Sequence, residues 1–118
     1  MKLVHGIDII EWNREELNNP SFAKRILVDD ELKYYLQLNS LKEKNRYLAS
    51  IFASKEAVMK AFKLKYGYND ILILKTKNER QVYLNKILIK ELVLSISYTE
   101  NYVVASVVGL INTVESNS

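Results

Sequence analysis

The segment that begins at Ser40 constrains this chain more than any other, because it continues without a glycine or proline as far as Gly67. Ser40 and Glu43 have the spacing of a capping box, in which the two side chains satisfy backbone N–H groups at the start of a helix. Apolar residues then recur mostly at intervals of three and four, at Leu48, Ile51, Phe52, Val58, Met59 and Phe62. The pattern predicts a long helix that stops near Gly67 and buries one apolar face against a sheet.

The residues on both sides of this helix favour β-structure. Residues 2–11 are dense in Leu, Val and Ile, which predicts a strand that is buried on much of both faces. Four more strands are expected, with the last two forming a hairpin, at residues 70–75, 81–84, 92–98 and 102–110. Residues 85–91 fit a short helix and a bulged strand equally well.

Pro20 interrupts any long helix within residues 13–28, so short helical pieces are expected there, before a helix that begins near Asp29. The chain of 118 residues contains no linker, which predicts one domain over residues 1–118. The polar residues 112–118 are expected to form a disordered tail. Together the patterns predict an α+β domain, in which the long helix packs against an antiparallel sheet that contains the N-terminal strand.

The composition excludes several kinds of site and location. The chain has no cysteine, which removes disulfides, thiolate zinc sites and thiol nucleophiles, so any metal must take oxygen ligands. No apolar run approaches the length of a membrane span and no signal peptide is visible, which predicts no membrane partner and a cytoplasmic location. The net charge of +3 and the pI near 9.0 suit an anionic small molecule, an acidic protein or a nucleic acid about equally.

Two carboxylates stand within largely apolar stretches, Asp8 in the first strand and Glu56 in the long helix. A buried carboxylate needs a cation, because desolvating an unpaired one costs several kcal/mol. Lys55 and Lys60 are candidate partners, and Lys60 lies one helical turn after Glu56, so a helix ion pair is one interpretation. The alternative is a magnesium site, in which the two carboxylates hold the ion and substrate phosphates complete its shell.

Two motifs carry a resemblance to a known family. The sequence GIDIIE at residues 6–11, followed by FASKEAVMKA at residues 52–61, resembles the paired signature of phosphopantetheinyl transferases. The likeness to the holo-acyl-carrier-protein synthase branch extends to KRIL at residues 24–27, YLA at residues 47–49 and LSISYT at residues 94–99. The resemblance implies an enzyme of fatty acid biosynthesis. Such an enzyme transfers 4′-phosphopantetheine from coenzyme A to a serine of apo acyl carrier protein and releases adenosine 3′,5′-bisphosphate.

The resemblance also implies the roles of particular residues. Asp8 and Glu56 match magnesium ligands, and Lys60 matches a lysine that approaches the coenzyme A pyrophosphate. The general base is left open between Lys60, Glu56 and a metal-bound water. The residues expected to contact coenzyme A are Lys42, Lys44, Arg46, Lys55, Lys60, Ser97, Tyr98 and Thr99. The residues expected to dock the acidic helix of the carrier protein are Arg14, Phe22, Lys24 and Arg25.

The family also implies a homotrimer with the cofactor cleft between neighbouring subunits. Two positions depart from the family pattern: Ile51 stands where related enzymes have arginine, and Tyr98 stands where they have histidine. Both replaced groups are expected to touch phosphates of coenzyme A. Isoleucine has no donor and tyrosine keeps one, so we expect weaker coenzyme A binding than in relatives that carry the arginine.

Two rival functions stay open: a scaffold of the same fold that has lost transfer activity, and a small basic nucleic-acid-binding module. The tyrosines do not form one strand-borne stacking platform, so no nucleic-acid partner is expected. His5 and Trp12 are interpreted as structural residues. The three cations that open the long helix fit a solvated basic face as well as they fit a nucleotide site; they are Lys42, Lys44 and Arg46.

Overall fold

In the computed structural model, which describes residues 1–112, the predicted long helix is α3 (Leu41–Ala61). The Ser40 hydroxyl accepts a hydrogen bond from the Glu43 N–H at 3.1 Å, which confirms the serine half of the predicted capping box. The Glu43 carboxylate accepts a bond from the same hydroxyl at 3.1 Å. Residues 113–118, which make up most of the predicted tail, lie outside the described residues.

The helix ends earlier than the sequence predicted. Its last residue is Ala61, whereas the predicted stop was Gly67. Lys63 and Leu64 follow with φ angles of 54° and 65°, in the left-handed region where an α-helix does not continue. The prediction was wrong because it looked for a glycine at the stop, and here two residues with side chains take that backbone conformation.

The strands form two antiparallel sheets of three strands each. In the first sheet, β6 (Tyr102–Ile111) lies between β1 (Lys2–Glu11) and β5 (Leu92–Tyr98), so the predicted C-terminal hairpin pairs with the N-terminal strand. The second sheet contains, in order, β2 (Ile71–Lys75), β3 (Arg80–Leu84) and β4 (Ile87–Leu88). Residues 85–91 fitted either a short helix or a bulged strand. Asn85 and Lys86 have positive φ angles and form a tight hairpin turn, which is followed by the short strand β4.

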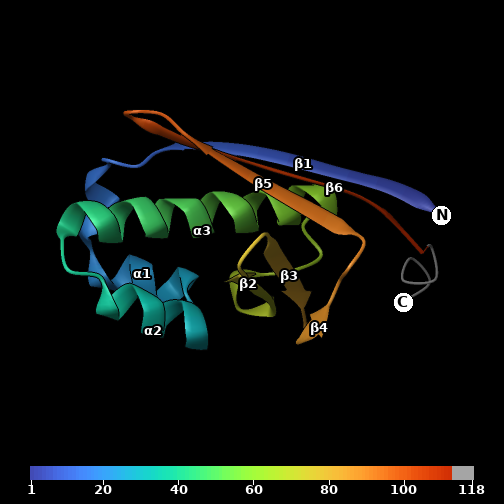
Figure 1. The fold of residues 1–118 in the computed structure, drawn as a ribbon, viewed down its shortest axis with the longest axis horizontal. Helices are drawn as coiled ribbons and strands as arrows, with labels where there is room; N and C mark the ends of the chain where they lie inside the picture. Colours follow the sequence, from blue (N-terminus) through green and yellow to red (C-terminus); the bar gives the residue numbers. More distant parts are fainter. Residues whose placement is uncertain (113–118) are drawn as a thin grey trace.

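Short helices complete the fold at η1 (Glu15–Asn18), α1 (Pro20–Ile26), α2 (Asp29–Gln37) and η2 (Tyr68–Asp70). Figure 1 shows α3 between the β1–β6–β5 sheet on one side and α1, α2 and the second sheet on the other. The predicted α+β architecture is confirmed, although the second sheet was not foreseen as a separate unit. Within the described residues, no helix combines the length and the apolar character needed to cross a bilayer.

Strand β1 presents alternate residues to α3 and away from it. Gly6 faces the helix, and a Cβ at this position would lie 1.9 Å from the Ala57 carbonyl oxygen, so only glycine lets the strand approach this closely. The outward residues Leu3, Ile7 and Ile9 are 65%, 51% and 59% exposed. The prediction of burial on both faces was therefore wrong for the single chain, because α3 covers only one face of the sheet.

Candidate active site

The two predicted carboxylates lie where β1 passes over α3. Asp8 faces the helix, and its Oδ1 accepts a hydrogen bond from the Lys60 ammonium at 2.9 Å. Lys60 also donates to the Ile7 carbonyl at 3.0 Å, which ties the end of α3 to the strand. Glu56 lies one helical turn before Lys60 and accepts a hydrogen bond from the Tyr68 hydroxyl. In this structure Lys60 thus pairs with Asp8 and not with Glu56, so the interpretation as a helix ion pair was wrong.

Both carboxylates act on the Tyr68 hydroxyl. Burial, the hydrogen bond to Glu56 and the negative charges of Glu56 and Asp8 raise the Tyr68 pKa to about 12, and the charge of Arg25 opposes the rise. Tyr68 is therefore a protonated donor at neutral pH. The acid of the first strand and the acid of the long helix are both close enough to influence this one phenol. Sequence reasoning missed Tyr68, which lies in a short turn and belongs to no motif.

The oxygen atoms at this place fit a magnesium ion. Asp8 Oδ1 and Glu56 Oε2 each accept one protein hydrogen bond, so each carboxylate retains its second oxygen for a cation. Across residues 1–112, no group of three or more carboxylate or histidine side chains lies together as a complete metal cage. Two carboxylates suit magnesium, because it keeps waters and completes its shell with substrate phosphates.

Lys55 lies in the interior, where the sequence had suggested a cofactor contact. Its side chain and that of Glu31 are both 0% exposed and form an ion pair at 2.7 Å. The Lys55 ammonium also donates to the carbonyl oxygens of Ile26 at 2.8 Å and Tyr68 at 3.1 Å. Burial lowers the Lys55 pKa and raises the Glu31 pKa, and their mutual attraction opposes both shifts. Since all three donors are used inside the protein, the predicted contact of Lys55 with coenzyme A does not fit this structure.

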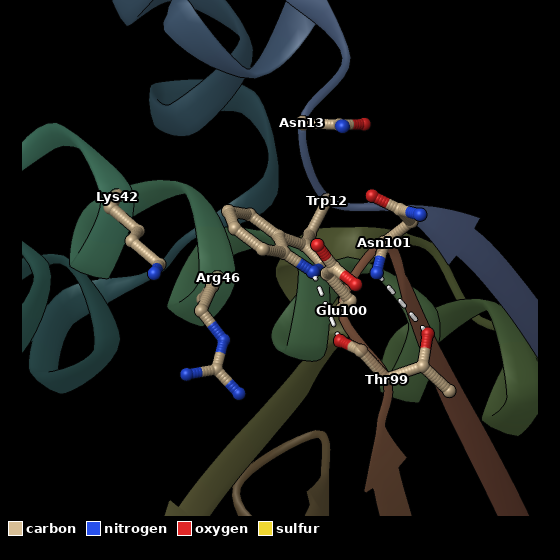
Figure 2. Close-up of a pocket in the computed structure, with 7 residues that line it drawn as sticks. All are labelled: Trp12, Asn13, Lys42, Arg46, Thr99, Glu100 and Asn101. Carbon is tan, nitrogen blue, oxygen red and sulfur yellow. Dashed lines mark hydrogen bonds between the residues drawn. The ribbon is translucent and has the colours of Figure 1, made fainter.

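A groove of about 370 Å³ lies between α3 and the β5–β6 turn, and we call it the tryptophan groove. Its lining residues are Trp12, Asn13, Lys42, Arg46, Thr99, Glu100 and Asn101. Figure 2 shows Lys42 and Arg46 on α3 beside Trp12, whose ring centre lies 5.9 Å and 5.7 Å from their charged groups. Trp12 Nε1 donates to the Thr99 carbonyl at 3.3 Å. Three predicted cofactor contacts thus share one groove, together with Trp12, which the sequence had suggested was only structural.

A second, larger groove of about 680 Å³ runs from α3 to the second sheet, and Lys42, Arg46, Ile51 and Tyr98 are among its lining residues. The Arg46 guanidinium lies 4.6 Å from the centre of the Tyr98 ring and 5.7 Å from that of Trp12, so two aromatic rings hold it between the grooves. Ile51 is only 3% exposed. Arg46 therefore supplies a charged, forked donor to the groove in which Ile51 supplies none.

Two other predicted cofactor contacts lie apart from these grooves. The Lys44 ammonium lies 5.5 Å from the ring centre of Tyr35 on α2. Ser97 is exposed and pairs with Val104 in the β5–β6 hairpin. Because side chains alternate along a strand, Ser97 points away from the face on which Tyr98 meets Arg46. The single chain therefore does not bring Lys44 or Ser97 together with the other predicted contacts.

The residues predicted to dock a carrier protein form what we call the docking patch, on α1 and just before η1; they are Arg14, Phe22, Lys24 and Arg25. The three cations of this patch are exposed, and the Arg25 guanidinium lies 5.4 Å from the Phe22 ring centre. Phe22 packs on Phe52 at 5.5 Å, and Phe52 stacks on Tyr68 at 5.9 Å. The docking patch is thus connected to the carboxylates through two aromatic rings.

Two acids beside a lysine, with basic grooves nearby, suit a phosphorylated ligand, because magnesium and cationic side chains neutralise phosphate charge. The profile of the 4′-phosphopantetheinyl transferase superfamily matches residues 5–107. The chain belongs to this superfamily.

Individual relatives agree with this assignment. The chain is 85% identical over 112 residues to the holo-(acyl-carrier-protein) synthase of Ureaplasma parvum serovar 3, over 95% of this chain and 97% of that protein. The structure of holo-ACP-synthase from Plasmodium yoelii has a TM-score of 0.76 and 29% identity, covering 92% of this chain and 97% of its own. A holo-(acyl-carrier-protein) synthase from Bacillus anthracis, solved in complex with CoA (3′,5′-ADP), has a TM-score of 0.69 and 32% identity, covering 90% and 94%.

Proposed function

We propose that this protein transfers the 4′-phosphopantetheine group of coenzyme A to a serine of apo acyl carrier protein. The serine oxygen forms a bond to the β-phosphorus of coenzyme A, and the bond from that phosphorus to the bridging oxygen breaks. Adenosine 3′,5′-bisphosphate leaves, and the serine proton passes to a base. The observation that carries the proposal is the contact of Asp8 with Lys60, one helical turn after Glu56, in a chain 85% identical to a holo-(acyl-carrier-protein) synthase.

In this proposal Asp8 and Glu56 hold a magnesium ion, which when bound neutralises charge on the pyrophosphate. Lys60, already beside Asp8 at 2.9 Å, adds a positive charge at the same place. Arg46 and Lys42, with Tyr98 and Thr99 beside them, hold the adenosine bisphosphate end of the substrate. The docking patch receives the acidic helix of the carrier protein, because its cations flank an aromatic anchor.

We also propose a homotrimer. The outer face of the β1–β6–β5 sheet carries exposed apolar side chains from all three strands, namely Leu3, Ile7, Ile9, Val93, Val108 and Leu110. An apolar patch of this kind marks an interaction surface, and cover by neighbouring copies would account for the apolar outer side of β1. Sedimentation equilibrium is expected to give the mass of three chains, and a monomer at micromolar concentration would contradict the assembly. The cytoplasmic location stays a prediction of the sequence.

One assay tests the proposed reaction against its rivals. The protein is incubated with apo acyl carrier protein, coenzyme A and Mg²⁺, and the carrier is weighed by mass spectrometry. We expect the carrier to gain one phosphopantetheine group, and to gain none when Mg²⁺ is removed by a chelator. Binding of carrier without any gain in mass would favour the inactive scaffold. Steeply salt-dependent binding to generic RNA, without a gain in mass, would favour the nucleic-acid module.

A further inference from the structure

The Tyr68 hydroxyl donates its hydrogen bond to one particular oxygen of Glu56, Oε2. A bond from a phenol to an ionised carboxylate is charge-assisted, so it is stronger than a bond between neutral groups. It also fixes the rotation of the carboxylate about its last torsion. Because Oε2 already accepts the Tyr68 hydrogen bond, Oε1 is the Glu56 oxygen that keeps both lone pairs for a cation.

Tyr68 is held from two directions. Its ring stacks on Phe52, with the centroids 5.9 Å apart and the planes at 29°. Its backbone carbonyl accepts a hydrogen bond from the Lys55 ammonium at 3.1 Å. Lys55 is in turn fixed by Glu31, because both side chains of that ion pair are 0% exposed. The ring contact and the buried ammonium together keep the Tyr68 hydroxyl directed at Glu56.

Asp8, on the strand β1 that packs on α3, is restrained in the same manner. Its Oδ1 accepts the Lys60 ammonium at 2.9 Å, which leaves Oδ2 for a cation. Each carboxylate is therefore oriented through one oxygen by a protein donor. Groups that orient metal ligands matter to the metal, since their loss typically weakens binding by about 10–100-fold.

We infer that Tyr68 is a positioning residue, which orients Glu56 so that its second oxygen binds the magnesium ion. The inference rests on the proposed function, because Glu56 is a metal ligand only within that proposal. A competing role exists, since Phe52 also connects Tyr68 to Phe22 of the docking patch. A role in carrier docking would affect the carrier and not the metal, which makes the two roles separable by experiment.

The test substitutes Tyr68→Phe and measures metal binding directly. Mn²⁺ is titrated into the full-length protein with saturating coenzyme A, and free Mn²⁺ is followed by electron paramagnetic resonance. We expect an approximately 10-fold weaker Mn²⁺ affinity. In turnover assays we expect a matching rise in the KM for Mg²⁺, with kcat at saturating Mg²⁺ and the KM for carrier protein little changed.

The matched control is Tyr83→Phe, which removes a phenolic hydroxyl that donates to Gln81 in the second sheet. It should leave Mn²⁺ affinity unchanged, and circular dichroism should show that both variants keep the fold of the parent. Unchanged Mn²⁺ affinity in Tyr68→Phe would overturn the inference, as would a raised KM for carrier protein alone. A Glu56→Gln variant separates failure of the proposed metal site from failure of the Tyr68 inference. If both Tyr68→Phe and Glu56→Gln bind Mn²⁺ normally, the proposed metal site is wrong. If only Glu56→Gln loses Mn²⁺ binding, the metal site stands and the role of Tyr68 is wrong.

Discussion

Replacing Glu56 by glutamine is expected to lower the rate of phosphopantetheine transfer by on the order of 100-fold or more. The amide has nearly the same shape, and its oxygen can still accept the Tyr68 hydrogen bond, so the fold should be retained. The amide lacks the negative charge that a divalent cation requires from a site with only two carboxylates. The rate is measured from the mass of the carrier protein over time, at Mg²⁺ concentrations that span the KM of the parent.

The concentration series shows where the loss arises. Weakened metal binding predicts that part of the lost rate returns at high Mg²⁺, whereas an effect on folding predicts no such recovery. Glu79→Gln is the matched control, because it neutralises one exposed carboxylate in the β2–β3 turn, and it should leave the rate unchanged. A Glu56→Gln variant with parental rate and parental dependence on Mg²⁺ would remove Glu56 from the site.

Local patterns were enough to predict the main elements of the fold. The cap at Ser40 and the apolar periodicity that follows it predicted α3, because both depend on residues within a few turns of one another. The strand predictions at the C-terminal end match β5 and β6 closely, since turn residues bound two apolar runs. The end of α3 was missed, because no intrinsic preference of Lys63 or Leu64 indicates a positive φ.

Contacts between side chains that are far apart in the sequence could not be predicted from local patterns. Lys55 stands in a motif rich in charge, and nothing near it shows that Glu31, from another helix, neutralises it. The position of Tyr68 against Glu56 depends on how the chain turns after α3, which again is not a local property. By contrast, the first strand and the long helix carry their acids in recognisable motifs, so Asp8 and Glu56 could be selected before any coordinates were known.

Replacing Lys55 by methionine is expected to lower the free energy of unfolding by about 3–5 kcal/mol, because it leaves the buried Glu31 carboxylate without a counter-ion. Glu31 would keep hydrogen bonds from the N–H groups of Ile73 at 2.7 Å and Val28 at 3.0 Å. These bonds compensate only part of the cost of a buried charge. Urea unfolding followed by circular dichroism measures the loss.

The pH dependence of that loss identifies its cause. Burial already raises the Glu31 pKa above its ordinary value of 4.5, and removing Lys55 deletes the attraction that lowers it, so the pKa rises further. An acid whose pKa is raised in the folded state takes up a proton on folding. The loss of stability in Lys55→Met is therefore present above the folded-state pKa of Glu31, and it shrinks as the pH falls through that pKa. Adding Glu31→Gln to Lys55→Met should restore most of the stability, because no buried charge is left.

The exposed ion pair of Arg14 and Glu16 is the control for burial. Arg14→Met should lower the free energy of unfolding by less than about 1 kcal/mol. An equal loss in Arg14→Met and Lys55→Met would contradict the buried setting of Lys55.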